Sequence, residues 1–264
     1  MPGESPMDII DKNIIQLLLK DGRIPQKRIA DELKISPQAL KYRLNKLIED
    51  GVIKKFVLHV NPEFYGNTQV FAAFVTDHDY TDDIFSRFRC LEDISIFGFQ
   101  GNNKNEIERI LKKAYEKLGP PFMNYTPPLS AKFTSVSDLD RKVIEALKEN
   151  PRMAVASMAK QLSISSASAK RRILRLKERR IASVIPILDL SKTDAVIFLL
   201  FSNKPELVMP VIETSLIFQI SDNNGGIAVC FSESLEAAKR LIVNARKSDE
   251  KSRVMVVYDY DFLN

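Results

Sequence analysis

Residues 8–56 read DIIDKNIIQLLLKDGRIPQKRIADELKISPQALKYRLNKLIEDGVIKKF, and residues 137–181 read SDLDRKVIEALKENPRMAVASMAKQLSISSASAKRRILRLKERRI. A shift of 129 residues aligns the two stretches without a gap, so that Asp11 matches Asp140 and Arg23 matches Arg152. Further identities include those at Ile15, Leu18, Ala30, Leu33, Ile35, Ser36, Lys41, Arg43 and Leu47. This agreement indicates that one unit was duplicated and fused within the chain.

Each copy of the unit predicts three helices followed by a strand. The apolar residues of 8–20 recur at helical spacing, Asp21-Gly22 ends that helix, and Pro25 is well placed in the first turn of the next. Ser36 is a good N-cap and Gly51 a good stop for the third helix. We expect helices at 8–20, 25–33 and 36–50 with a strand at 52–60. In the second copy we expect a helix capped by Ser137 or Asp138, helices at 153–162 and 165–180, and a strand at 181–188.

An alternating α/β region follows each helical unit. After the second unit, strands at 195–202, 216–221, 227–231 and 253–260, helices at 205–214 and 235–247, and a turn at 223–226 give the ferredoxin-like order βαββαβ. After the first unit we expect a strand at 70–76, a helix at 84–88, a strand at 94–100, a helix at 107–118, and a weak or missing third strand between 101 and 105. Prolines at 120–121 and 127–128 predict an extended linker.

The predicted fold class is therefore α+β. It comprises two winged helix-turn-helix domains and two ferredoxin-like domains in tandem, with the first ferredoxin-like copy degenerate. The expected boundaries are 1–60, 61–134, 135–190 and 191–264.

Positive charge is concentrated in the two repeated units. The chain carries a net charge of +5, whereas residues 8–55 sum to +4 and residues 138–182 to +7. Such a distribution is typical of a protein that contacts phosphates. The two cysteines form no CxxC motif and no cluster with histidine, so we expect no metal site, disulfide or cofactor. Without an apolar run of membrane-spanning length, we expect no membrane partner and a cytoplasmic location.

The third helix of the first copy has the pattern of a DNA-reading helix. Leu40, Leu44 and Leu47 form one anchoring stripe. Glutamine and asparagine can bind adenine edges, and lysine can reach guanine or phosphate. The candidate DNA-binding residues of this copy are Ser36 at the helix start, the outward Gln38, Tyr42, Asn45 and Lys46, and the flanking Lys41 and Arg43.

The second copy has more charge and fewer amides at the equivalent positions, which favours a grip on the DNA backbone. Its candidates are Ser165, Ser168, Lys170, Arg171, Arg172 and Arg175, and Leu174 also points outward. Other roles remain open. Arg43 and Arg172 are equally compatible with ion pairs inside their own unit, Lys46 and Arg175 with full solvation, Tyr42 with stacking on its own wing, and Leu174 with packing on a neighbouring element.

The chain resembles the Lrp/AsnC transcription regulators twice over. The resemblance is carried by IADELKIS (29–36) and YRLNKLIEDGVI (42–53) in the first copy, and by MAKQLSIS (158–165) and KRRILRLKERRI (170–181) in the second. It implies a DNA-binding domain and a ferredoxin-like domain that binds effectors and pairs subunits, so that the fused chain could form the pair within one molecule. It also leaves room for an unidentified small-molecule effector and for a homodimer of two chains.

Two departures from the family pattern stand out. Arg180 occupies the helix exit where the first copy has Gly51, which suggests a differently angled second wing. Only residues 223–226 resemble the glycine-containing turn of amino-acid-sensing members, and the first copy is expected to lack that hairpin. These departures argue against amino-acid sensing.

The leading hypothesis is a sequence-specific regulator that binds double-stranded DNA. It would act as an intramolecular pseudo-dimer on an asymmetric site, with half-sites roughly 34 Å apart. An enzyme resembling siroheme decarboxylases is one alternative, but the chain has only His59 and His78 as histidines and no visible nucleophile–base pair. A protein-interaction adaptor that kept the fold is the other. We therefore expect a non-enzyme.

Overall fold

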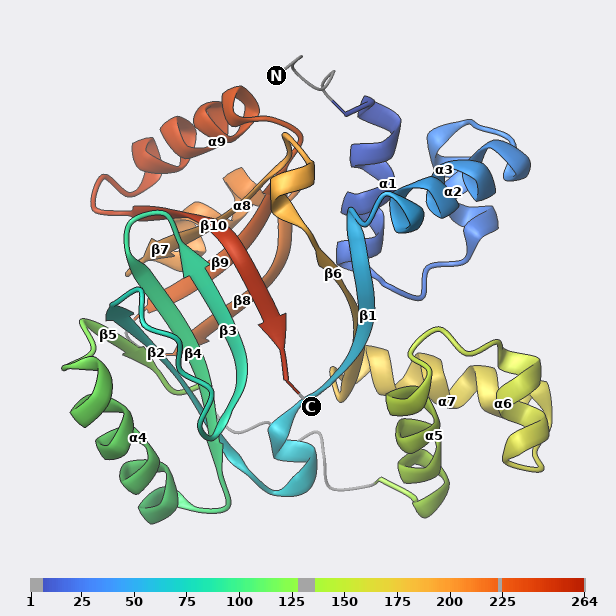
Figure 1. Cartoon of the computed structure of the whole chain (residues 1–264), viewed down its shortest axis with the longest axis horizontal. Helices are drawn as coiled ribbons and strands as arrows, with labels where there is room; N and C mark the ends of the chain where they lie inside the picture. Colours follow the sequence, from blue (N-terminus) through green and yellow to red (C-terminus); the bar gives the residue numbers. More distant parts are fainter. Residues whose placement is uncertain (1–6, 128–135, 223–224, 264) are drawn as a thin grey trace.

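The computed structural model describes residues 7–127, 136–222 and 225–263. Two helix-turn-helix units lie on one side of the molecule and a large antiparallel sheet on the other (Figure 1). A two-stranded ribbon, made from one strand of each repeated unit, runs between them. This arrangement places both helical units on the same ribbon.

The predicted helices of both units are confirmed. The first unit has α1 (Ile9–Lys20), α2 (Gln26–Leu33) and α3 (Pro37–Glu49), and the second has α5 (Asp138–Glu149), α6 (Val155–Gln161) and α7 (Ser166–Glu178). Asp8 caps α1, and Ser36 caps α3. Ser137, not Asp138, caps α5, through a reciprocal capping box with Asp140. Local capping and periodicity were therefore sufficient to locate these helices.

The two wings leave their helices in the same way, contrary to the expectation from Arg180. Gly51 has φ +72° and Arg180 has φ +55°, so both residues are left-handed helix ends. The strands that follow, β1 (Ile53–Val60) and β6 (Ala182–Leu188), pair antiparallel with each other. The wings are therefore held together by their own hydrogen bonds, and arginine tolerates the exit conformation that glycine prefers.

This equivalence predicts opposite effects for two substitutions. Gly51→Ala is expected to lower the free energy of unfolding by about 1 kcal/mol, because a side chain is introduced at positive φ. Arg180→Gly is expected to raise it by about 0.5 kcal/mol, because relief of the left-handed strain exceeds the entropy that glycine loses. Urea unfolding of both variants measures the two changes. A loss of stability in Arg180→Gly would contradict the account.

The large sheet joins the ferredoxin-like halves of both copies edge to edge. Its strands are β2 (Thr68–Val75), β3 (Ile84–Cys90), β4 (Ile94–Gly101), β5 (Met123–Tyr125), β7 (Val196–Ser202), β8 (Leu216–Asp222), β9 (Gly225–Ser232) and β10 (Arg253–Phe262). They lie in the order β5-β2-β4-β3-β10-β7-β9-β8, and the seam is the antiparallel pair β3–β10. Three helices, α4 (Lys104–Leu118), α8 (Pro205–Ile212) and α9 (Leu235–Ser248), pack on the outer face (Figure 1).

The first ferredoxin-like copy is degenerate in a different way from that expected. Residues 84–88, expected as a helix, belong to strand β3. No separate strand lies between 101 and 105, as expected, because β4 ends at Gly101 and α4 begins at Lys104. The β3–β4 hairpin is therefore present, and the helix that should precede it is the missing element. Ile84 and Phe88 have helical spacing, but β3 pairs on both sides, with β4 and β10, and this pairing overrides the local pattern.

The second copy follows the predicted βαββαβ order, from β7 through α8, β8, β9 and α9 to β10. Of the predicted turn at 223–226, residues 223–224 lie outside the described part of the chain. Residues Gly225 and Gly226 begin β9.

Candidate nucleic-acid interface

Helix α3 is anchored as its leucine stripe predicts. Leu40, Leu44 and Leu47 are buried in the core of the first unit. Tyr42, on the opposite face, is 70% exposed and so does not stack on its own wing. The other exposed candidates on this helix are Gln38, Lys41, Asn45 and Lys46. The polar face of α3 is therefore open to solvent along its length.

Helix α7 presents a comparable but more basic face. Ala169 and Leu176 anchor it. Lys170 and Arg171 are exposed, whereas Ser168 is half-buried. Leu174 is 49% exposed, so it stays on the outward face and is not covered by a neighbouring element. Two cations and one apolar side chain thus project from the middle of this helix.

Arg43 is held by carboxylates of its own unit. Its guanidinium lies 2.8 Å from Asp8 and 2.9 Å from Asp11, both at the start of α1. A backbone hydrogen bond from Ile10 and the ion pair with Arg43 lower the pKa of Asp8. Hydrogen bonds to Asp11 and Asp8 likewise raise the pKa of Arg43. Arg43 therefore ties α3 to α1 and remains a quarter exposed at its side chain.

In the second unit, Asp140 holds two of the candidate arginines. Arg172 donates to Asp140 at 2.8 Å, and Arg175 forms a second, short contact with the same carboxylate. Burial alone would raise the pKa of Asp140, but hydrogen bonds from Ser137 and Arg172 and the charge of Arg175 outweigh it and lower that pKa. Among the described residues, the candidate cations without an ion pair are Lys41, Lys46, Lys170 and Arg171.

Ser36 and Ser165 act as helix caps. The Ser36 hydroxyl accepts a hydrogen bond from the Ala39 amide at 3.1 Å, and the Ser165 hydroxyl accepts one from the Ser168 amide, also at 3.1 Å. Both residues are exposed, so the positive ends of α3 and α7 face solvent. Helix ends of this kind can contact phosphate.

The two helical units touch through equivalent turns, which sequence reasoning did not foresee. Arg23 donates to the carbonyl oxygens of Pro151 and Met153 at 2.6 and 2.7 Å. Lys177 lies 2.5 Å from Asp21. The identity of Arg23 and Arg152 in the two copies could have indicated this contact, because equivalent residues of two repeats meet where the repeats are related by a two-fold axis. These bonds fix α3 and α7 relative to each other.

Each helical unit is also fastened to the rest of the chain, by different chemistry in the two halves. Lys12, which is nearly buried, forms an ion pair of 2.6 Å with Asp194. At the corresponding place in the second half, Arg141 lies over the ring of Phe64 at 5.1 Å and Lys148 over that of Tyr65 at 5.1 Å. The duplicated architecture is thus preserved with non-identical contacts.

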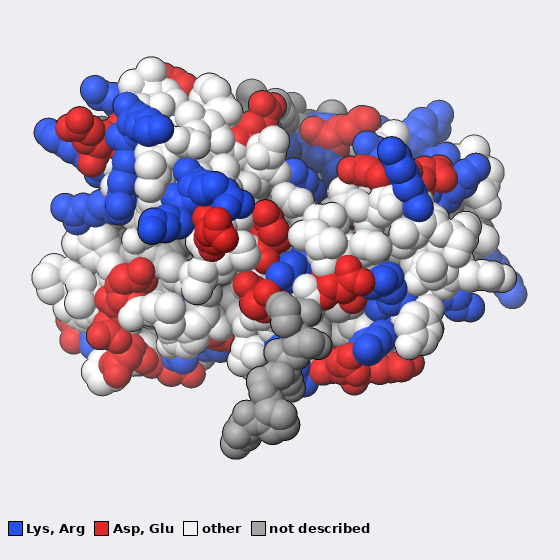
Figure 2. All heavy atoms as spheres, turned by 90° about the horizontal axis from the view of Figure 1, so that it is seen from above, with Lys and Arg blue, Asp and Glu red and all other residues white. Residues whose placement is uncertain are grey.

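Basic side chains are mixed with acidic ones over the upper face of the molecule. Seen from above, lysine and arginine gather toward both ends, with acids interspersed among them (Figure 2). The end opposite the helical units is that of α9, whose last turn carries Arg246 and Lys247. The exposed basic surface is therefore not confined to the repeated units. Within the described residues, no helix is long and apolar enough to cross a membrane and no cluster could hold a metal ion.

Comparison with known proteins gives two domain matches. Residues 7–54 match the winged helix-turn-helix DNA-binding model, and residues 136–177 match the AsnC-type helix-turn-helix model. The chain is 43% identical over 60 residues to the HTH-type transcriptional regulator FL11 of Pyrococcus furiosus, a match that covers 23% of this chain and 40% of that regulator. It is 32% identical over 145 residues to an uncharacterized HTH-type transcriptional regulator of Pyrococcus abyssi, with 52% of this chain and 80% of the relative covered.

Two solved structures are also similar. The siroheme decarboxylase NirDL has a TM-score of 0.48 at 15% identity, and the match covers 97% of this chain and 93% of the NirDL chain. LrpC of B. subtilis has a TM-score of 0.31 at 21% identity, and the match covers 51% of this chain and 99% of the LrpC chain.

Proposed function

We propose that this chain, which belongs to the Lrp/AsnC family of helix-turn-helix transcription regulators, reads one asymmetric site on double-stranded DNA as an intramolecular pseudo-dimer. One observation carries the proposal. Two reading helices, α3 and α7, are held in one molecule by the β1–β6 ribbon and by the Arg23 contacts, yet they expose different side chains. A two-fold symmetric protein would present the same side chains to both half-sites.

The proposed roles follow from side-chain chemistry. In α3, Gln38 and Asn45 would bind base edges, with Tyr42 beside them and Lys41 and Lys46 on phosphates or guanine. In α7, Lys170 and Arg171 would bind phosphates. The helix ends at Ser36, Ser165 and Ser168 would lie at the DNA backbone. Ion pairs would let Arg43, Arg172 and Arg175 orient the helices, and the solvent-facing edge of each guanidinium group would bind phosphate.

We extend the proposal to the whole chain. It would act in the cytoplasm as a DNA-binding protein without a catalytic role, with domains at 1–60, 61–134, 135–190 and 191–264. Pairing of two chains would add a second set of reading helices.

The salt dependence of DNA affinity tests the phosphate contacts. Lys41→Gln and Lys170→Gln are each expected to weaken binding for all sequences and to reduce the slope of log affinity against log salt by about 1. Lys112→Gln, on the exposed side of α4, is the matched control and should leave the slope unchanged. Fluorescence anisotropy over a salt series gives the slopes. Equal slopes in all three variants would refute the assigned interface.

Asymmetry requires its own measurement. Selection of bound duplexes from a random pool should recover two unlike half-sites, and Gln38→Ala should relax only one of them. Recovery of a palindrome would refute the pseudo-dimer, and failure to bind any duplex at low salt would refute DNA binding itself.

A further inference from the structure

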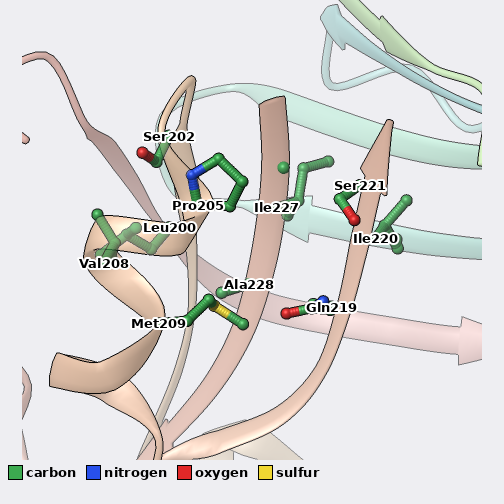
Figure 3. Close-up of a pocket in the computed structure, with 11 residues that line it drawn as sticks. Leu200, Ser202, Pro205, Val208, Met209, Gln219, Ile220, Ser221, Ile227 and Ala228 are labelled. Atoms are coloured by element: carbon green, nitrogen blue, oxygen red, sulfur yellow. The ribbon is translucent and has the colours of Figure 1, made fainter. Parts of the chain in front are cut away.

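A cavity of about 690 Å³ lies between the inner face of the sheet and the β1–β6 ribbon. Pockets for small organic molecules usually measure about 300–1,000 Å³. By contrast, the hollow between α8 and strands β8 and β9, where Met209 faces Ala228 and Gln219, has room for only about 10 Å³ (Figure 3). That hollow holds no more than a water molecule. Of these two spaces, only the larger can take a ligand.

The cavity exists because the sheet is curled. The rings of Phe88 in β3 and Phe218 in β8 have centroids 6.1 Å apart, although β10, β7 and β9 separate these strands in the sheet. Tyr125 in β5 likewise approaches Phe201 in β7 at 6.4 Å. The inner face is therefore wrapped around its own side chains, as in a small barrel. The aromatic residues that line the cavity are Phe71, Phe85, Phe88, Phe218, Tyr260 and Phe262.

The rim of the cavity is positively charged. Its basic residues are Lys20, Arg23, Lys177, Arg179 and Arg180, and its acids are Asp21 and Glu63. Lys177 is paired with Asp21, and Arg23 donates to carbonyl oxygens. Arg180 is exposed and has no ion pair within the described part of the chain. An excess of positive charge beside apolar walls attracts an anion and concentrates its field.

A histidine, His59, lies on the cavity wall. His59 packs against Phe85 and Phe262, with ring centroids 5.8 and 5.2 Å apart, and no hydrogen bond from a described residue reaches its imidazole. Burial lowers the pKa of His59 to about 4, so the ring is neutral near pH 7. A neutral imidazole offers one donor and one acceptor, and polar groups in such a place normally find a partner.

We propose that this cavity binds a small organic anion whose flat apolar body lies on the aromatic inner face of the sheet and whose carboxylate lies at the rim beside Arg180. Helix α7 lines the cavity through Ile173, Leu176 and Lys177, but none of the candidate DNA-binding residues of α3 and α7 does, so the proposal does not depend on DNA binding. Charge complementarity selects the anion, and the aromatic wall selects the flat body.

Three probes with one ring system separate these features. Calorimetric titration of the full chain compares 2-naphthoate, the neutral 2-naphthamide and the cationic 2-naphthylmethylammonium. We expect one naphthoate bound per chain, the amide about tenfold weaker, and the cation weaker still. Absence of saturable naphthoate binding, or equal affinity for naphthoate and amide, would overturn the proposal.

A pair of variants locates the carboxylate. Arg180→Gln is expected to weaken naphthoate about fivefold and to leave the amide unchanged. Glutamine meets the same backbone conformation as arginine, so folding should be preserved, and thermal unfolding checks this. Arg246→Gln, on the exposed side of α9, is the matched control and should change neither affinity. If Arg180→Gln and Arg246→Gln behave alike, the assigned site is wrong.

Discussion

Replacing Gly22 by alanine is expected to destabilise the chain by about 3 kcal/mol and to separate helices α3 and α7. A Cβ atom at Gly22 would lie 2.3 Å from the carbonyl oxygen of Val184 and 2.8 Å from its carbonyl carbon, and this backbone cannot swing aside like the end of a side chain. The Gly22 amide also donates to the same oxygen at 3.1 Å. Relief of the clash therefore breaks the junction between the first helical unit and the second wing.

Gly66→Ala is the control for adding a methyl group without a clash. Gly66 has φ +81° and no atom within 4 Å of an added Cβ, so only backbone strain of about 1 kcal/mol is expected. Urea unfolding measures both variants, and anisotropy measures their affinity for DNA. The Gly22 variant should lose affinity while the Gly66 variant keeps it. Equal stability losses would show that the Gly22 junction yields easily.

Removal of the Asp140 carboxylate is the second large effect. Asp140 is 1% exposed and accepts from Arg172, Arg175 and Ser137. Asp140→Ala leaves the Arg172 and Arg175 guanidinium groups without their carboxylate and removes half of the capping box with Ser137. The free energy of unfolding is therefore expected to fall by about 2–4 kcal/mol, and water that reaches the partly exposed arginines brings the loss toward the lower figure. Asp11→Ala is the matched variant in the first unit. It should lose about 1 kcal/mol, because Arg43 retains Asp8.

The same carboxylate makes stability depend on acid pH. The pKa of Asp140 is lower in the folded chain than its ordinary 3.8, so its contribution is complete above that value. The contribution is lost as the pH falls from about 3.8 through the lower folded pKa. The stability difference between wild type and Asp140→Ala should therefore shrink only in this acid range. A difference that stays constant down to pH 2, about two units below the ordinary value, would contradict the role given to ionised Asp140.

Local signals explain why the helices of both units could be predicted. Ser36 and Ser137 cap helices through their own side chains, and the Leu40–Leu44–Leu47 stripe indicates which face is buried. The exposure of Gln38 and Tyr42 follows from that stripe. These features depend on residues within a few positions of one another.

The misassigned strand and the arginine pairs depend on distant residues. Strand β3 pairs with β10, more than 160 residues away in the chain, and no local pattern contains that partner. The sequence did not show whether Arg172 forms an ion pair, because its carboxylate partner Asp140 lies 32 positions away in the chain. The cavity above the sheet was not predicted at all, because it arises from the curl that brings Phe88 to Phe218.

The amino-acid sequence by itself determined the duplication, the two three-helix units, their capping residues and the outward side chains of α3 and α7. Tertiary structure alone decided the β3–β10 seam, the Arg23 contacts between the units, and the cavity with its charged rim. It also decided which candidate cations pair with a carboxylate among the described residues. The physical reason is the reach of the interactions. A helix satisfies its backbone hydrogen bonds within one turn, whereas strands, buried ion pairs and cavity walls take their partners from anywhere in the chain.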